Sequence, residues 1–189
     1  MTRKTRVGKI FVMIVRLKED MVSEAIKIFE GLPHYFNPLG IQRLKDEIKE
    51  YFAKPPSPEL AGFFVYVKDD EILGMIGYKR RLYHREYEIT WFAVRKDCQR
   101  RGIGRGLVSY LSNFLSQYQL ELLTANIPDD PISREFYYKM GFRSINRFLN
   151  HEGEKLVYQK RFGYIADTCQ ELVANYLRRK KLKELKKKP

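Results

Sequence analysis

One segment of the chain, from Tyr87 to about Tyr118, constrains the fold more than any other. Residues 87–94 have the apolar character of a strand, the sequence RKDCQRRGIGRG follows, and apolar residues at helical spacing then begin at Ile103. The junction between strand and helix contains Gly102 and Gly104, with Arg100, Arg101 and Arg105 around them. The free N–H groups at a helix start and the positive end of its dipole attract anions, and glycine lets the backbone approach a ligand closely. The segment therefore predicts a phosphate-binding turn.

The spacing of the glycines limits which phosphate ligand this turn could bind. A dinucleotide fingerprint needs a third glycine at the sixth position, which here is Leu107, and a P-loop needs a terminal Gly-Lys-Ser/Thr, which is absent. Taken alone, the loop is equally consistent with a glycine-shaped turn surrounded by solvated arginines.

The order of predicted elements is strand, two helices, three strands, helix, strand, helix, two strands. The strands are predicted at residues 10–15, 63–67, 72–84, 87–94, 120–124, 142–149 and 155–159, and the helices at 20–31, 41–52, 103–118 and 131–141. A further, basic helix is predicted in the C-terminal extension. This order predicts a mixed α/β (α+β) fold with a mostly antiparallel sheet of six to seven strands flanked by helices.

Local signals place several of the boundaries. We expect Asp20 to cap the first helix and Gly31 to end it, and the aromatic stretch at residues 32–40 to form a loop. The short polar turn at residues 68–71 predicts an antiparallel hairpin. Asp130, followed by proline, is a favourable cap for the helix that ends at Gly141.

The basic charge of the chain is concentrated at its ends. The net charge is +13, but residues 1–9 hold four Lys/Arg and no acid, and residues 163–189 hold eight Lys/Arg against three acids. Such runs are most often simply solvated, although nucleic-acid contact is an alternative. Cys98 and Cys169 match no metal-ligand spacing, and the longest apolar run, residues 10–15, is far shorter than the roughly 20 residues of a membrane helix. We therefore expect a cytoplasmic protein with no metal and no membrane segment.

Two stretches together resemble the GNAT superfamily of acetyl-CoA-dependent N-acetyltransferases. ITWFAVRKDCQRRGIGRGLVSYL, at residues 89–111, resembles that family's acetyl-CoA motif, a strand ending in Ala-Val and a Gln/Arg-x-x-Gly-x-Gly/Ala loop. FYYKMGF, at residues 136–142, resembles the family's Phe-Tyr-x-Lys-x-Gly-Phe. The predicted elements follow the family's order from about residue 7 to residue 162, which implies the GNAT fold.

The resemblance implies where acetyl-CoA would bind. Its pyrophosphate would lie on the loop formed by Gln99, Arg100, Arg101, Gly102, Ile103, Gly104 and Arg105. Its pantetheine arm would pair with the backbone of Phe92, Ala93 and Val94, as an added strand does. An N–H near Val94 would steady the oxyanion.

The resemblance also implies catalytic roles. Tyr137 matches the position whose hydroxyl protonates the departing thiolate, although a core tyrosine is the alternative interpretation. Glu88 matches a glutamate that histone-acetylating members carry as the base, and on an ideal strand it would share a face with Val94. Glu86 and His84 are other candidates, Glu88 could equally be a surface glutamate paired with arginines, and many relatives use a chain of waters instead.

One position departs from the family pattern. Where the family often has an asparagine that contacts the cofactor arm, this chain has Asp130, and Asn126 lies too far from it in sequence to be a simple substitute. We retain Asp130 as a candidate cofactor contact, although its neighbourhood could instead belong to the acceptor site.

These observations predict an N-acetyltransferase domain at residues 1–162 and a basic helical extension at residues 163–189. The enzyme would move the acetyl group of acetyl-CoA to a primary amine, either a protein N-terminus, a lysine or a small amine. The alternative is a non-catalytic acetyl-CoA-binding module whose basic tail binds nucleic acid or the ribosome. The apolar face of the extension makes a homodimer an equally good use of that tail.

Overall fold

The computed structural model describes residues 12–81, 85–150 and 153–162. The strands are β1 (Val12–Arg16), β2 (Ala61–Lys68), β3 (Glu71–Arg80), β4 (Glu86–Val94), β5 (Leu122–Pro128), β6 (Arg143–Asn150) and β7 (Gly153–Arg161). The helices are α1 (Val22–Glu30), α2 (Pro38–Ala53), α3 (Ile103–Ser116) and α4 (Pro131–Lys139), with single 3₁₀ turns at Glu19–Met21 and Lys96–Cys98. The predicted basic helix at residues 163–189 and the candidate His84 lie outside the described residues.

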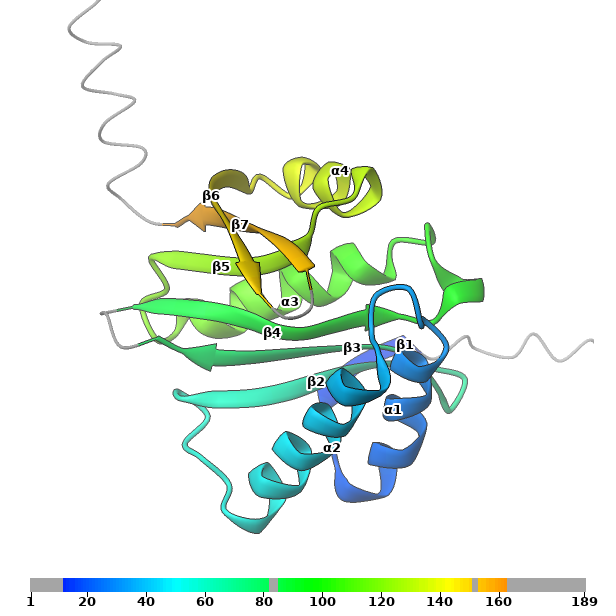
Figure 1. Ribbon diagram of the computed structural model, residues 1–189. Helices are drawn as coiled ribbons and strands as arrows, with labels where there is room; N and C mark the ends of the chain where they lie inside the picture. The colour runs from blue at the N-terminus through cyan, green and yellow to red at the C-terminus, as the bar shows by residue number, and fades with distance from the viewer. Residues whose placement is uncertain (1–11, 82–84, 151–152, 163–189) are drawn as a thin grey trace, which may run out of the picture.

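The strands form one twisted seven-stranded sheet in the order β1-β2-β3-β4-β5-β7-β6. Every neighbouring pair is antiparallel except β4 and β5, which are parallel. The prediction of a mixed, mostly antiparallel sheet flanked by helices is therefore confirmed. Helices α1 and α2 cover one face of the sheet and α3 lies behind the other (Figure 1).

A separate apolar core lies on each face. On one face, Phe29 of α1 and Leu44 of α2 pack against Met75 of β3. On the other, Leu107 and Leu111 of α3 are fully buried against the sheet, and Tyr137 of α4 joins the same cluster. The two cores hold the sheet rigid between layers, which fixes the position of side chains at the ends of its strands.

Two predicted boundaries are wrong for local reasons. Asp20 does not cap α1, because the chain enters that helix through the 3₁₀ turn at Glu19–Met21, and Met21 takes the cap position without a side-chain bond. The loop predicted to reach residue 40 ends earlier, because the Asn37 Oδ1 accepts a hydrogen bond from the Gly40 N–H at 2.7 Å and starts α2 at Pro38.

Other local predictions are confirmed. Gly31 ends α1, although with φ −71° and not in a left-handed conformation. The turn at residues 68–71 joins β2 and β3 as an antiparallel hairpin. Asp130 caps α4, and its Oδ1 accepts the N–H groups of Ile132 and Ser133, both at 2.9 Å.

Candidate active site

A fork between β4 and β5 forms the centre of the site. These parallel strands pair only from Glu86 to Ile89, opposite Leu122 to Ala125. Beyond that point the two strands diverge. The rest of β4 is paired with β3 along one edge, and its other edge has no neighbouring strand among the described residues. The Arg95 N–H donates to the Leu73 carbonyl of β3 at 2.9 Å. Because backbone groups alternate in direction along a strand, the peptide groups of Val94 and Phe92 point into the fork and those of Ala93 point toward β3.

A β-bulge in β4 lies at the point where the fork opens. The register with β3 shifts so that Thr90 and Trp91 together stand opposite Gly77. The bulge reverses the alternation of side chains: Ile89 belongs to the core under α3, whereas Trp91 belongs to the core under α1 and α2. The prediction that Glu88 shares a face with Val94 is therefore wrong, since it assumed an ideal strand.

The glycine loop has the geometry of an anion site. Arg100 and Gly102 both have positive φ, at 63° and 85°, and a Cβ added to Gly102 would find no heavy atom within 4 Å. The first N–H groups of α3, which follow directly, have no partner within the helix. A left-handed glycine with open space in front of free N–H groups fits a phosphate group.

Contacts at this loop tie it to β4. The Gln99 side chain donates to the Val94 carbonyl at 3.2 Å, which holds the loop against the open edge of the strand. Gly104 leaves no spare room, because an added Cβ would lie 3.2 Å from the Phe92 ring and 3.4 Å from the Phe136 ring. The anion site and the strand edge are therefore fixed relative to each other.

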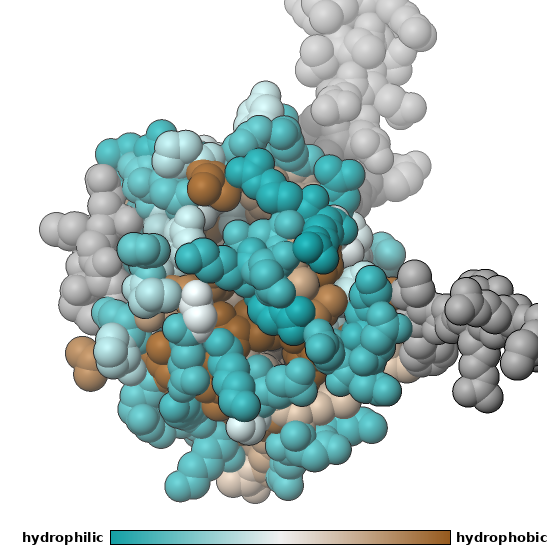
Figure 2. Space-filling model, turned by 90° about the vertical axis from the view of Figure 1, so that its right-hand side faces the viewer, coloured by the Kyte–Doolittle hydropathy of each residue, from teal (hydrophilic) through white to brown (hydrophobic). Residues whose placement is uncertain are grey.

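One cavity of about 970 Å³ joins these features. It runs from the glycine loop along the fork to the loop between α1 and α2, and apolar residues form part of a hollow framed by hydrophilic ones in the face that Figure 2 shows. Among the predicted site residues, those that line it are Glu88, Phe92, Ala93, Val94, Gln99, Arg100, Gly102, Ile103, Gly104, Arg105 and Tyr137. Arg101 and Asp130 are not among the lining residues.

Tyr137 lies inside the cavity and is 5% exposed. Its ring packs edge-on against Phe136 and Phe142, with ring centroids 5.2 Å apart in each case, and lies 6.4 Å from the ring of Phe92. Burial raises the pKa of its phenol well above the ordinary 10.0. The hydroxyl therefore stays protonated at neutral pH, which is what a proton donor requires. The neighbouring Tyr138, by contrast, is 61% exposed.

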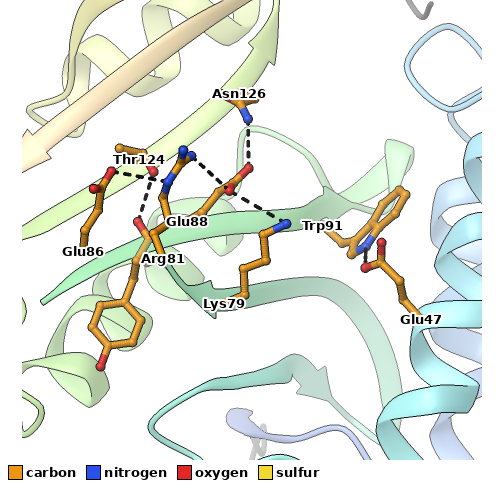
Figure 3. A network of polar contacts seen from close by, with 9 residues as sticks. Glu47, Lys79, Arg81, Glu86, Glu88, Trp91, Thr124 and Asn126 are labelled. Carbon is orange, nitrogen blue, oxygen red and sulfur yellow. Dashed lines mark hydrogen bonds and ion pairs between the residues drawn. The ribbon is translucent and has the colours of Figure 1, made fainter. Parts of the chain in front are cut away.

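Glu88 lies beside the closed end of the fork and is held by three donors (Figure 3). Its Oε1 accepts from the Asn126 side chain of β5 at 2.8 Å. Its Oε2 lies 3.9 Å from Lys79 of β3 and 3.3 Å from Arg81, which directly follows that strand. The Glu88 side chain is 14% exposed. Its bond to the neutral Asn126 amide links the two strands of the fork, and the two cations approach its other oxygen. Glu86 instead pairs with Arg81 at 3.7 Å.

The wall opposite the fork is aromatic and carries a second carboxylate. Glu47 of α2 accepts a hydrogen bond from the indole N–H of Trp91 at 2.5 Å. Phe36, from the loop before α2, lies with its ring centroid 6.4 Å from that of Trp91 and 4.8 Å from that of Phe29. Sequence analysis predicted neither Glu47 nor Asn126 as a site residue, because each meets its partner only through tertiary contacts over long sequence separations.

Asp130 lies beside the cavity and has one unsatisfied oxygen. Its Oδ1 caps α4, but its Oδ2 is buried and has no hydrogen-bond partner among the described residues. Tyr35 lies near it: burial first, and then the negative charge of Asp130, raise the pKa of the Tyr35 phenol. Contact between Asp130 and a cofactor stays a prediction.

Two further features of the described residues bear on the site. No three His, Cys, Asp or Glu side chains of this part of the chain cluster as metal ligands would. No helix in the described ranges is both long enough and apolar enough to span a membrane.

Comparison with solved structures finds the same fold in many proteins. A GNAT-family protein from Desulfovibrio desulfuricans has a TM-score of 0.71 at 19% identity, over 80% of this chain and 99% of that one. The ribosomal-protein-S18-alanine N-acetyltransferase of Escherichia coli has a TM-score of 0.63 at 16% identity, over 82% and 96% of the two chains. PaiA N-acetyltransferase from Thermoplasma acidophilum, in complex with coenzyme A, has a TM-score of 0.64 at 14% identity, over 80% and 99%. At these identities the likeness shows the fold alone.

Comparison by sequence identifies the family. No curated protein matches the chain. The model of the acetyltransferase (GNAT) family matches residues 25–142, which include the fork, the glycine loop and Tyr137. The protein thus belongs to the GNAT family of acetyltransferases, enzymes that use acetyl-CoA.

Proposed function

We propose that this protein transfers the acetyl group of acetyl-CoA directly to a primary amine. The observation that carries the proposal is the continuity of one cavity, which joins the glycine loop, the open edge of β4 and the buried hydroxyl of Tyr137. The acceptor is a small amine, a protein N-terminus or a lysine side chain.

The donor would lie along the glycine loop and the fork. The N–H groups at the start of α3, with Arg100 and Arg105 in the cavity wall, would hold the pyrophosphate, and Arg101 would add charge from outside the wall. The pantetheine arm would take the place of a strand in the fork and pair with the peptide groups of Phe92 and Val94. In that position the thioester would lie close to Tyr137, whose ring lies 6.4 Å from that of Phe92.

The reaction would proceed by direct attack. The acceptor nitrogen forms a bond to the carbonyl carbon as the carbon–sulfur bond breaks, and the Tyr137 hydroxyl gives its proton to the departing sulfur. The attacking nitrogen releases one proton as the amide forms, and that proton restores the Tyr137 hydroxyl. The acceptor must also lose a proton before attack, because an amine with a pKa near 10 is mostly ammonium at neutral pH. We propose Glu88 as the group that receives this proton. Since the bulge turns it to the other face of β4 from Val94, the proton would travel through solvent in the cavity.

The test is thiol release from acetyl-CoA against a panel of small amines, N-terminal peptides and lysine peptides, with mass spectrometry of the acceptors. Gly102→Ala and Gly141→Ala are a matched pair, because both glycines are left-handed, with φ 85° and 87°. Both changes should cost about 1–2 kcal/mol of stability. Only Gly102→Ala places a methyl group in the anion site, so only it should raise the KM for acetyl-CoA, by about 10-fold.

Acetylation of at least one amine class, with the expected difference between the two alanine variants, supports the proposal. Tight acetyl-CoA binding with no amine-dependent thiol release across the panel would overturn it in favour of a non-catalytic binding module.

A further inference from the structure

The acceptor half of the cavity, which we define as the part lined by Arg43, Glu47, Lys79, Glu88 and Lys155, carries an excess of positive charge. Glu88 lies in this half, and two cations approach its carboxylate: Lys79 of β3 and Arg81, which directly follows β3. Neither pair is tight: Lys79 lies 3.9 Å from the carboxylate and is 58% exposed, and Arg81 lies 3.3 Å away and is 44% exposed. Arg81 is shared between Glu88 and Glu86, so Lys79 is the cation beside Glu88 that retains room for another anion (Figure 3).

The walls of this half do not offset that excess. Arg43 of α2 and Lys155 of β7 add two cations to the lining, and each also takes part in a further interaction. Glu47 adds one carboxylate, whose observed bond is to the neutral indole of Trp91. Within the lining of this half, three cations thus stand against two carboxylates, Glu47 and Glu88.

The acidic residues just beyond the lining are already compensated. Asp129 accepts a charged hydrogen bond from Arg134 and lies 3.4 Å from Arg147. Asp130 caps α4, where the positive end of the helix dipole favours a carboxylate. A cationic substituent on the acceptor would therefore meet net repulsion in this half, whereas an anionic one would meet attraction.

From this arrangement we infer that the acceptor carries an anionic group in addition to its amine, and that Lys79 binds this group. The inference rests on the proposed acetyl transfer and names its acceptor class: an amine with a carboxylate or similar acid on the same chain, not a polycationic amine. Lys79 is then a residue that determines specificity. It is suited to this role because it lies directly opposite Glu88 in the sheet register and its side chain reaches into the cavity.

The strand geometry also sets the separation between the amine and the acid. The reacting centre lies near Phe92, and Lys79 pairs with Glu88, four residues earlier on β4. At about 3.3 Å per residue, shortened by the bulge, this separation is roughly 10 Å along the strand. A lysine side chain can recover about half of it by extending toward the fork. The acid therefore lies several bonds from the amine, farther than in an α-amino acid.

The experiment uses the full chain and a series of linear amino acids: glycine, γ-aminobutyrate and ε-aminocaproate. Each is compared with its own methyl amide, which keeps the amine and removes the negative charge. The ratio of kcat/KM for acid and amide is measured for the wild type, for Lys79→Met and for Lys45→Met. Lys45 is the matched control, because it is a half-exposed lysine of α2 that pairs with Glu30 at 3.0 Å and does not line the cavity. Binding of the same compounds to CoA-saturated protein is measured by calorimetry, so that binding is observed without transfer.

We expect the acid to be preferred by about 10-fold for the longer members and less for glycine. In Lys79→Met this ratio should fall toward one, and in Lys45→Met it should stay at the wild-type value. Acetylation that is equal for acid and amide at every length, or better for the amide, would overturn the inference while leaving the proposed function intact. If no compound of this series is acetylated, calorimetry decides: tighter binding of the acids supports the inference, and equal or no binding overturns it. The proposed function is judged separately, by thiol release across the wider amine panel.

Discussion

Replacement of Tyr137 by phenylalanine removes one hydroxyl and leaves the packing of the ring unchanged. Its contacts to Phe136 and Phe142 are ring contacts, and no described residue hydrogen-bonds to its hydroxyl. The change therefore leaves no polar group of the described chain without a partner, and the free energy of unfolding should change by less than about 1 kcal/mol. Any loss of turnover can then be assigned to chemistry.

The size of that loss follows from the leaving group. Positioned general acids contribute about 10²- to 10⁴-fold. A thiol with a pKa of about 8.5, the value for cysteine, is far more acidic than an alcohol, so a thiolate needs less help to leave than an alkoxide does. We therefore expect kcat to fall by about 100-fold, equivalent to roughly 2.7 kcal/mol, with the KM for acetyl-CoA nearly unchanged.

The assay is steady-state thiol release in wild type, Tyr137→Phe and Tyr138→Phe. Tyr138 is the control, since it is the adjacent residue of α4 and is 61% exposed. Because burial raises the pKa of Tyr137 above 10.0, the ratio of wild-type to Tyr137→Phe rates should stay constant between about pH 6 and about pH 9. Unchanged turnover in Tyr137→Phe would refute the acid role, and a ratio that titrates within this range would refute the raised pKa.

Three further predictions concern stability. Burial raises the pKa of Tyr78 to about 12, so the neutral phenol contributes its full stabilisation of the fold below about pH 10. This contribution, about 2 kcal/mol, should be lost as the pH rises toward 12. Chemical unfolding of Tyr78→Phe should lack this alkaline dependence. Gly106→Ala should stabilise α3 by up to about 1 kcal/mol, because its added methyl group meets nothing nearer than 3.8 Å. Gly104→Ala should increase the stability less, because its methyl group would lie 3.2 Å from the Phe92 ring. Equal unfolding midpoints in urea for the two variants would contradict this. Asp130→Ala should lower the stability by about 1 kcal/mol, because it removes the cap of α4. Asp130→Asn keeps the cap and removes only the buried charge. A large loss of stability in the asparagine variant would therefore show that Oδ2 has a partner in solution.

Much of the fold could be predicted from the sequence because its signals are local. The apolar periodicity of α3, the polar turn between β2 and β3 and the Asp130-Pro131 start of α4 each depend on a few neighbouring residues. The same holds for the glycine loop, since a left-handed Gly102 before a helix is a short-range requirement. The boundaries that failed were those at Asp20, where a 3₁₀ turn without a side-chain cap precedes α1, and at residues 38–40, where Asn37 caps α2.

The tertiary structure decided which side chains of the site meet. A strand predicted from its own sequence is assumed to alternate ideally, and that assumption put the Glu88 side chain on the same face as Val94. The bulge opposite Gly77 reversed this, because the register between two strands depends on how both pack and on neither sequence alone. The contacts of Glu88 with Asn126, and of Trp91 with Glu47, span 38 and 44 residues. The sequence by itself determined the glycine loop and the helix start that we propose bind the donor, because these features are built from neighbouring residues. The proposed acceptor half depends on the tertiary structure, because its residues come from α2, β3, β4 and β7.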